Sequence, residues 1–252
     1  MVISIKNSFG AVLLGTALLT TVNSQANDKS FYKKLNISDF AGERKKFSTK
    51  FQYESRVEGP LQSGLPGIFE VITYPAKSGQ LQGLISVLPD DGKKHPVIIW
   101  ITGGDSNSVD GRSLFQASPR SNDQSAAAYR QAGLAMFFPT LRGGNTNPGK
   151  HEWFYGEVDD VIAAANYLAS LPQIDPKRIY LGGHSTGATL SLLVAAASSQ
   201  FRAIFAFGPV EDPIFYDPPP APINYQSLSA QEHSMRAPII WLPSIKTPVF
   251  VL

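Results

Sequence analysis

The chain has 252 residues, of which 43% are hydrophobic and 17% charged, a balance typical of a folded globular domain and not of a disordered chain. A formal net charge of +2 gives no reason to expect nucleic acid or an anionic membrane surface as partner. There is no cysteine, which excludes disulfides, thiolate metal sites and a cysteine nucleophile, and the four histidines lack the spacing of a metal motif.

The first 26 residues have the features of a secretory signal peptide. Lys6 precedes an apolar run at 9–22, and small residues follow it up to Ala26. The run is shorter than the roughly 20 residues of a spanning helix, which favours cleavage after Ala26 over a membrane anchor. We therefore expect a periplasmic or secreted protein, with a buried N-terminal helix as the alternative. Residues 27–66 would then form an N-terminal extension.

From residue 67 onward, short apolar runs alternate with helical patterns. Two runs joined by a turn at 77–80 predict a strand pair, and a continuous apolar run ending at Gly103 predicts a strand buried on both faces. In chain order, residues 67–139 contain predicted strands at 68–74, 81–89, 96–102 and 134–139, with a short predicted helix at 125–133.

The second half continues the alternation. A helix is predicted at 156–172, with Glu157, Asp159 and Asp160 in the first turn, where the helix dipole favours acidic residues. Strand 178–181, helix 187–199, strand 203–207 and a last strand at 247–252 follow. Such alternation predicts an α/β fold, a mostly parallel doubly wound sheet with helices on both faces. The proline-rich segment 209–247 predicts an irregular insertion over one rim, with a helix that ends ahead of Pro238.

The stretch from Gly183 to Gly187 reads G-x-S-x-G, with Ser185 at its centre. It lies between a predicted strand and a predicted helix of small residues, which is the setting of a nucleophile elbow. In that setting the serine hydroxyl is lifted above the sheet edge by a strained turn. The sequence thus predicts Ser185 as nucleophile and the backbone N–H of Thr186, at the helix N-terminus, as an oxyanion donor.

Two further loops follow parallel strands and should reach the same rim. Gly103 and Gly104 allow backbone N–H groups to approach the oxyanion, so this loop is the candidate for the second donor. The loop "LRGGNTNPGK" follows the fourth strand, and there Arg142 and Asn145 are candidates for substrate contact.

The stretches "DPKRIYLGGHSTGATLSLL", "LRGGNTNPG", "FYGEVDDVIAAANYLA" and "RAPIIWLPSIKTPVFVL" together resemble the catalytic domain of prolyl oligopeptidase-like serine hydrolases, close to the dienelactone hydrolases. The resemblance runs from residue 67 to residue 252. It implies an α/β-hydrolase domain that cleaves a small-molecule ester or peptide substrate through an acyl-serine at Ser185, without a cofactor. Thr102 stands where oligopeptidases proper carry an oxyanion-binding tyrosine. Backbone N–H groups alone would therefore have to bind the oxyanion in this chain.

The triad order in this fold is serine, then acid, then histidine. By the family pattern the acid follows the strand at 247–252 and the histidine follows the next strand, so we expect this chain to lack the last strand and helix and both residues. An unassisted serine is a poor nucleophile, and loss of a triad member leaves about 10³–10⁴-fold catalysis over water. The sequence therefore predicts a C-terminally truncated serine hydrolase with little or no turnover.

Other residues offer weaker substitutes. His233 is the one histidine after Ser185, and we expect it on the surface of a short helix; His184 should point away from Ser185. Glu211 or Asp212 could supply an acid from the preceding strand. The alternative function is a non-catalytic exported protein, derived from a hydrolase, that binds a ligand or partner at the pocket rim.

Overall fold

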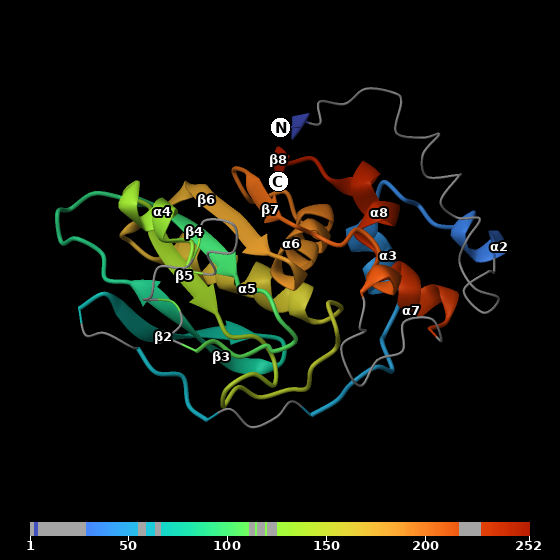
Figure 1. Ribbon diagram of the computed structural model, residues 1–252, viewed down its shortest axis with the longest axis horizontal. Helices are drawn as coiled ribbons and strands as arrows, with labels where there is room; N and C mark the ends of the chain where they lie inside the picture. Colours follow the sequence, from blue (N-terminus) through green and yellow to red (C-terminus); the bar gives the residue numbers. More distant parts are fainter. Residues whose placement is uncertain are drawn as a thin grey trace.

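The computed structural model describes residues 3–4, 29–54, 59–63, 67–110, 114, 119, 125–216 and 228–252. Its elements, in chain order, are β1 (Ile3–Ser4), α2 (Lys29–Tyr32), α3 (Phe40–Lys45), β2 (Phe69–Ala76), β3 (Gly79–Ser86), β4 (His95–Ile101), α4 (Ala127–Gln131), β5 (Ala135–Pro139), α5 (Glu157–Ser170), β6 (Ile174–His184), α6 (Thr186–Ala197), β7 (Ile204–Phe207), η2 (Pro213–Phe215), α7 (Ala230–Ser234), α8 (Pro238–Trp241), η4 (Leu242–Ser244) and β8 (Val249–Val251). Figure 1 shows their arrangement.

The strands form one sheet in the order β1-β8-β7-β6-β4-β5-β3-β2. The five strands from β5 through β4, β6 and β7 to β8 run parallel, each paired with its neighbour. The predicted strand pair is the antiparallel hairpin β2–β3, which joins the sheet through β5. The prediction of a mostly parallel, doubly wound sheet is confirmed.

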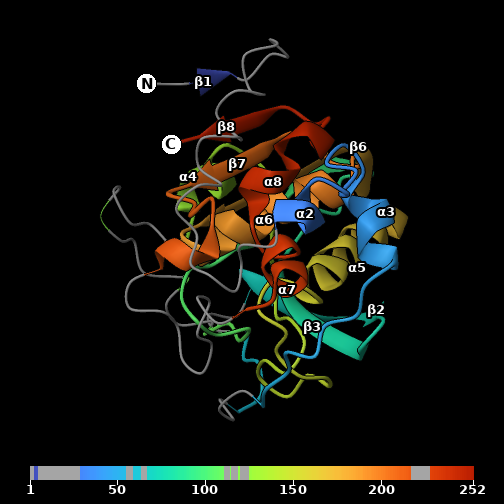
Figure 2. The same ribbon diagram turned by 90° about the vertical axis from the view of Figure 1, so that its right-hand side faces the viewer.

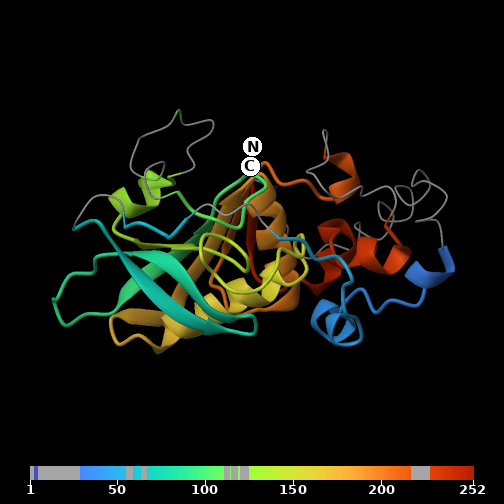
Figure 3. The ribbon, with the colours of Figure 1, turned by 90° about the horizontal axis from the view of Figure 1, so that it is seen from below.

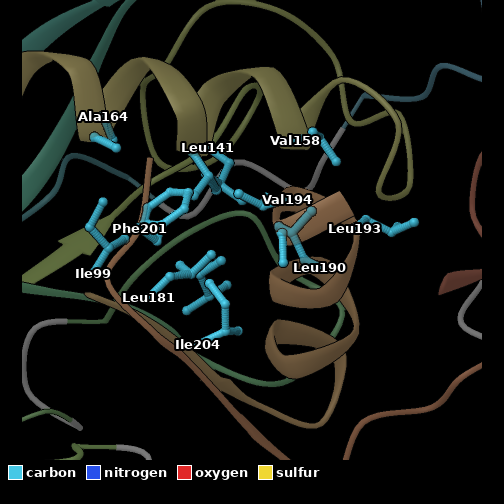
Figure 4. Packing of buried hydrophobic residues seen from close by; sticks show 14 of the residues in the cluster. Ile99, Leu141, Val158, Ala164, Leu181, Leu190, Leu193, Val194, Phe201 and Ile204 are labelled. Carbon is cyan, nitrogen blue, oxygen red and sulfur yellow. The ribbon is translucent and has the colours of Figure 1, made fainter. Parts of the chain in front are cut away.

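Alternate residues of the central strands serve two separate cores. Val97, Ile99 and Ile101 of β4 pack with α5 and α6, while Ile98 and Trp100 face the opposite side, where Tyr129 of α4 packs. Figure 4 shows Ile99, Leu181 and Ile204 directed at the side chains of α5 and α6. Viewed from below, α4 lies on the other side of the sheet from these two helices (Figure 3). This is why the run at 96–102 is apolar throughout.

The N-terminal extension packs against the C-terminal quarter of the chain. Figure 2 shows α2 and α3 beside α7 and α8. The rings of Phe40 in α3 and Trp241 in α8 lie 4.6 Å apart between centroids, and both side chains are fully buried. As predicted, α7 ends before Pro238. That proline then starts α8, as its fixed φ and missing N–H allow at a first helical position.

Two predictions fall largely outside the described residues. Of the predicted signal peptide, only Ile3–Ser4 is described, and it pairs antiparallel with β8. Residues 217–227 of the predicted insertion are likewise not described, so its position over the active-site rim stays a prediction. Within the described ranges, no helix is both long and apolar enough to cross a bilayer.

Candidate active site

Ser185 lies at the turn between β6, which ends at His184, and α6, which begins at Thr186. Its backbone has φ 54° and ψ −119°, a region that L-residues rarely adopt and that is strained for serine. The Ser185 N–H is held by the Phe207 carbonyl of β7 at 2.8 Å. The strand–serine–helix turn predicted from the sequence is therefore present, with the backbone strain of a nucleophile elbow.

The glycines around Ser185 are required by close backbone approach. A Cβ on Gly187 would lie 2.2 Å from the Ile101 carbonyl oxygen, and one on Gly183 would lie 2.5 Å from the Gly187 carbonyl carbon. A Cβ on Gly103 would lie 3.2 Å from the Ser185 Cβ. The end of β4, the elbow and the start of α6 therefore meet at one point, because none of these three positions carries a side chain.

The loop after β4 is tied to the helix by a side chain. The Thr186 hydroxyl donates to the Gly104 carbonyl at 2.7 Å, and Gly104 has φ 104°, which favours glycine. Gly103, Gly104 and Thr186 are thus brought together beside Ser185. The use of their N–H groups as oxyanion donors stays a prediction.

No histidine in the described ranges forms a hydrogen bond with Ser185 Oγ. His233 was expected on the surface, but it is 2% exposed. Its Nε2 lies 2.8 and 3.0 Å from the two carboxylate oxygens of Asp212, and its Nδ1 lies 2.8 Å from the Tyr32 hydroxyl. Both ring nitrogens are therefore occupied, and neither is left to accept a proton from serine. Asp212, a candidate acid, is the partner of this imidazole.

Arg142 takes a different role from the substrate contact predicted for it. Its side chain is buried, with Nε and Nη2 donating to the two Asp160 oxygens at 2.9 and 2.8 Å and Nη1 lying 3.1 Å from Glu152 Oε2. The guanidinium thus joins the loop after β5 to the first turn of α5. Asn145 is half-buried, and its Oδ1 accepts from the Val109 N–H at 2.9 Å. Its side chain therefore stabilises the loop after β4.

Sequence reasoning missed a small cavity beside the elbow. The cavity has a volume of about 30 Å³ and is lined by the loop after β4, the segment before α5 and the first turn of α6. His151 and Trp153 form part of its wall, with ring centroids 4.5 Å apart. Burial lowers the pKa of His151 to about 4. The available signal was the "HEWFYGE" stretch, in which a histidine, a carboxylate and three aromatics precede a helix that begins with a second carboxylate.

Comparison with known proteins relates part of the chain to a family. Residues 120–234, which contain Ser185, match the family model described as the prolyl oligopeptidase family. Over these residues the chain is similar to the prolyl oligopeptidase family. The resemblance inferred from the sequence motifs is thereby confirmed.

Short segments of this chain match curated proteins. It is 43% identical over 63 residues to a probable dipeptidyl-aminopeptidase B of Metarhizium robertsii, covering 24% of this chain and 7% of that protein. It is 41% identical over 54 residues to the polyketide transferase claH of Penicillium crustosum, covering 21% of this chain and 18% of that protein. The chain therefore spans only a small part of the length of these relatives.

A solved structure shows the same fold. The acylaminoacyl peptidase of Pyrococcus horikoshii superposes with a TM-score of 0.54 at 16% identity, over 72% of this chain and 31% of that one. At this level of identity the likeness shows the α/β-hydrolase fold alone.

Proposed function

We propose that Ser185 is the nucleophile of a serine hydrolase that acts on a small ester or peptide, and that these 252 residues by themselves react slowly. In the proposed step the Ser185 Oγ bonds to the carbonyl carbon, and the bond to the alcohol or amine leaving group breaks. The hydroxyl proton passes to the leaving group, and water then hydrolyses the acyl-serine.

The observation that carries this proposal is the strained backbone of Ser185 at a helix N-terminus. A residue held in this conformation costs free energy, and such strain is concentrated at functional sites. The N–H groups of the first helical turn have no acceptor within the helix, which suits an oxyanion. The proposed slowness is supported by the finding that no imidazole in the described ranges is hydrogen-bonded to Ser185, because a general base contributes about 10²–10⁴-fold.

The test is acylation by para-nitrophenyl acetate, followed by mass spectrometry of the intact protein, with and without added imidazole. We expect one acetyl group on Ser185 that forms slowly and forms at least about tenfold faster when imidazole supplies the base. The Ser185→Ala variant should remain unacylated under both conditions, and Ser170→Ala, at an exposed helix end, should behave like the unmodified chain.

Two results would contradict different parts of the proposal. Acetyl groups that remain in Ser185→Ala would exclude Ser185 as the nucleophile. Fast acylation that imidazole does not change would show that a base already serves Ser185, and the proposed slowness would be wrong.

We also propose export of the protein, on the basis of the apolar run at 9–22 and the small residues before Ala26. Expression of the gene in a bacterial host, followed by fractionation and N-terminal sequencing, should place the product outside the cytoplasm with Asn27 as its first residue. Recovery of a cytoplasmic product that still begins at the initiator methionine would contradict export.

A further inference from the structure

The cavity beside the elbow contains a buried carboxylate with one unsatisfied oxygen. Glu157, the first residue of α5, lines the cavity and is 1% exposed. Its Oε1 accepts from the Glu152 N–H at 2.7 Å and from Asn107 Nδ2 at 3.0 Å, and lies 3.5 Å from His151 Nε2. Its Oε2 is buried and has no hydrogen-bond partner among the residues that the structure describes. An unsatisfied buried carboxylate oxygen is costly, so its retention beside a cavity indicates a ligand.

The charges around the cavity favour a cation. Asp105 also lines it and is an exposed carboxylate. Burial holds the pKa of His151 at about 4, so this imidazole is neutral at pH 7 and adds no positive charge. The Arg142 guanidinium lies outside the lining, where it pairs with Asp160 and Glu152 and also interacts electrostatically with Glu157. The wall of the cavity thus carries carboxylates and, at neutral pH, no cationic side chain.

The remaining wall is aromatic. Trp153 and Phe154 line the cavity, and both have positive φ, 49° and 70° respectively. Bulky residues rarely adopt this conformation, so the backbone is strained at the two positions that place these rings in the wall. A buried carboxylate next to aromatic faces is the combination that binds an organic ammonium group, through a charge-assisted hydrogen bond and a cation–π contact.

We propose that this cavity binds a small primary ammonium group, with Glu157 Oε2 as its charged acceptor and the Trp153 ring as part of its wall. The cavity volume of about 30 Å³ admits a group of this size. The cavity also includes Thr186 and Gly187, the two residues after Ser185, so a bound ammonium lies next to the elbow. Binding here requires no turnover at Ser185.

The experiment measures thermal unfolding of the full chain with ethylammonium chloride, at constant ionic strength, with sodium chloride and ethanol as reference solutes. At ten times the dissociation constant, ethylammonium should raise Tm by roughly 3–6 °C, while neither reference solute should do so. Glu157→Gln keeps the shape of the side chain but removes its charge, and it should abolish the shift. The matched control is Glu70→Gln, on an exposed position of β2, which should keep it.

Asp105→Asn provides a second variant that leaves the buried network intact, and it should reduce the shift without removing it. Equal shifts in the unmodified chain and in Glu157→Gln would overturn the proposal, as would equal shifts with ethylammonium and sodium. If Glu157→Gln does not fold, the test depends on Asp105→Asn. The proposal would be overturned if ethylammonium raised the Tm of Asp105→Asn as much as that of the unmodified chain and sodium chloride had the same effect.

The ammonium group can belong to a free amine or to the substrate of Ser185, and acylation distinguishes these sources. If it belongs to a substrate, the para-nitrophenyl ester of aminohexanoate should acylate Ser185 faster than the ester of heptanoate, and Glu157→Gln should remove the difference. If it belongs to a free amine, the two esters should acylate equally while ethylammonium still raises Tm. Failure of acylation at Ser185 with a retained Tm shift would contradict the proposed hydrolase alone.

Discussion

Replacing Asp160 by asparagine is expected to lower the free energy of unfolding by about 3 kcal/mol, because it removes the main charge partner of a buried guanidinium and leaves Glu152 as the remaining ion pair. Asp160 is fully buried, and its oxygens accept from the Arg142 Nε, Nη2 and backbone N–H at 2.9, 2.8 and 3.0 Å. An asparagine can accept with one of its atoms only and cannot neutralise the cation.

Urea unfolding followed by circular dichroism measures this loss. Asp175→Asn is the matched control, because Asp175 pairs with Arg178 at 2.7 Å on the surface, where such pairs contribute about 0–1 kcal/mol. A loss of less than about 1 kcal/mol in Asp160→Asn would mean that the Arg142–Asp160 pair does not stabilise the junction between β5 and α5.

The stability of the protein should fall as the pH is lowered from about 6.5 to about 4, with His151 contributing on the order of 3 kcal/mol. Burial lowers the pKa of this imidazole in the folded chain to about 4, whereas the unfolded chain takes up the proton near 6.5. Between these values the unfolded state binds more protons, so stability is fully present above pH 6.5 and is lost toward pH 4.

The measurement is the free energy of unfolding at pH 7.5, 5.5 and 4.5 for the unmodified chain and for His151→Gln, which preserves a polar contact with the Tyr53 hydroxyl now 2.9 Å from Nδ1. The variant should lose less stability than the unmodified chain over this range. Gln80→Ala, at an exposed position without a titratable group, is the control and should leave the pH dependence unchanged. Parallel curves for the unmodified chain and His151→Gln would contradict a buried neutral imidazole.

The parts of the fold that could be predicted from the sequence are those with strong local signals. The run at 96–102 predicted a central strand because it is apolar on both faces, and the glycines around Ser185 predicted the elbow because only they permit the backbone approach at Gly183 and Gly187. The acidic first turn of α5 was read as a helix start, which is also correct.

What the sequence could not provide are contacts between distant segments. Helices α2 and α3 have four and six residues, too short for a periodic pattern, so the sequence predicts no element in the extension. The prediction of Arg142 at the substrate rim is wrong because nothing local shows that Asp160 neutralises it 18 positions later. The prediction of His233 at the surface is wrong for the same reason, since its partners Tyr32 and Asp212 come from other parts of the chain.

The packing of the extension against α7 and α8 has a consequence during synthesis. The Phe40 N–H donates to the Ser244 hydroxyl, 204 positions further along the chain, and the same hydroxyl donates to the Ile37 carbonyl. On the ribosome, α3 therefore emerges long before its partners exist. The nascent chain must keep Phe40 soluble until Trp241 and Ser244 have been synthesised, so this docking is a late step of folding.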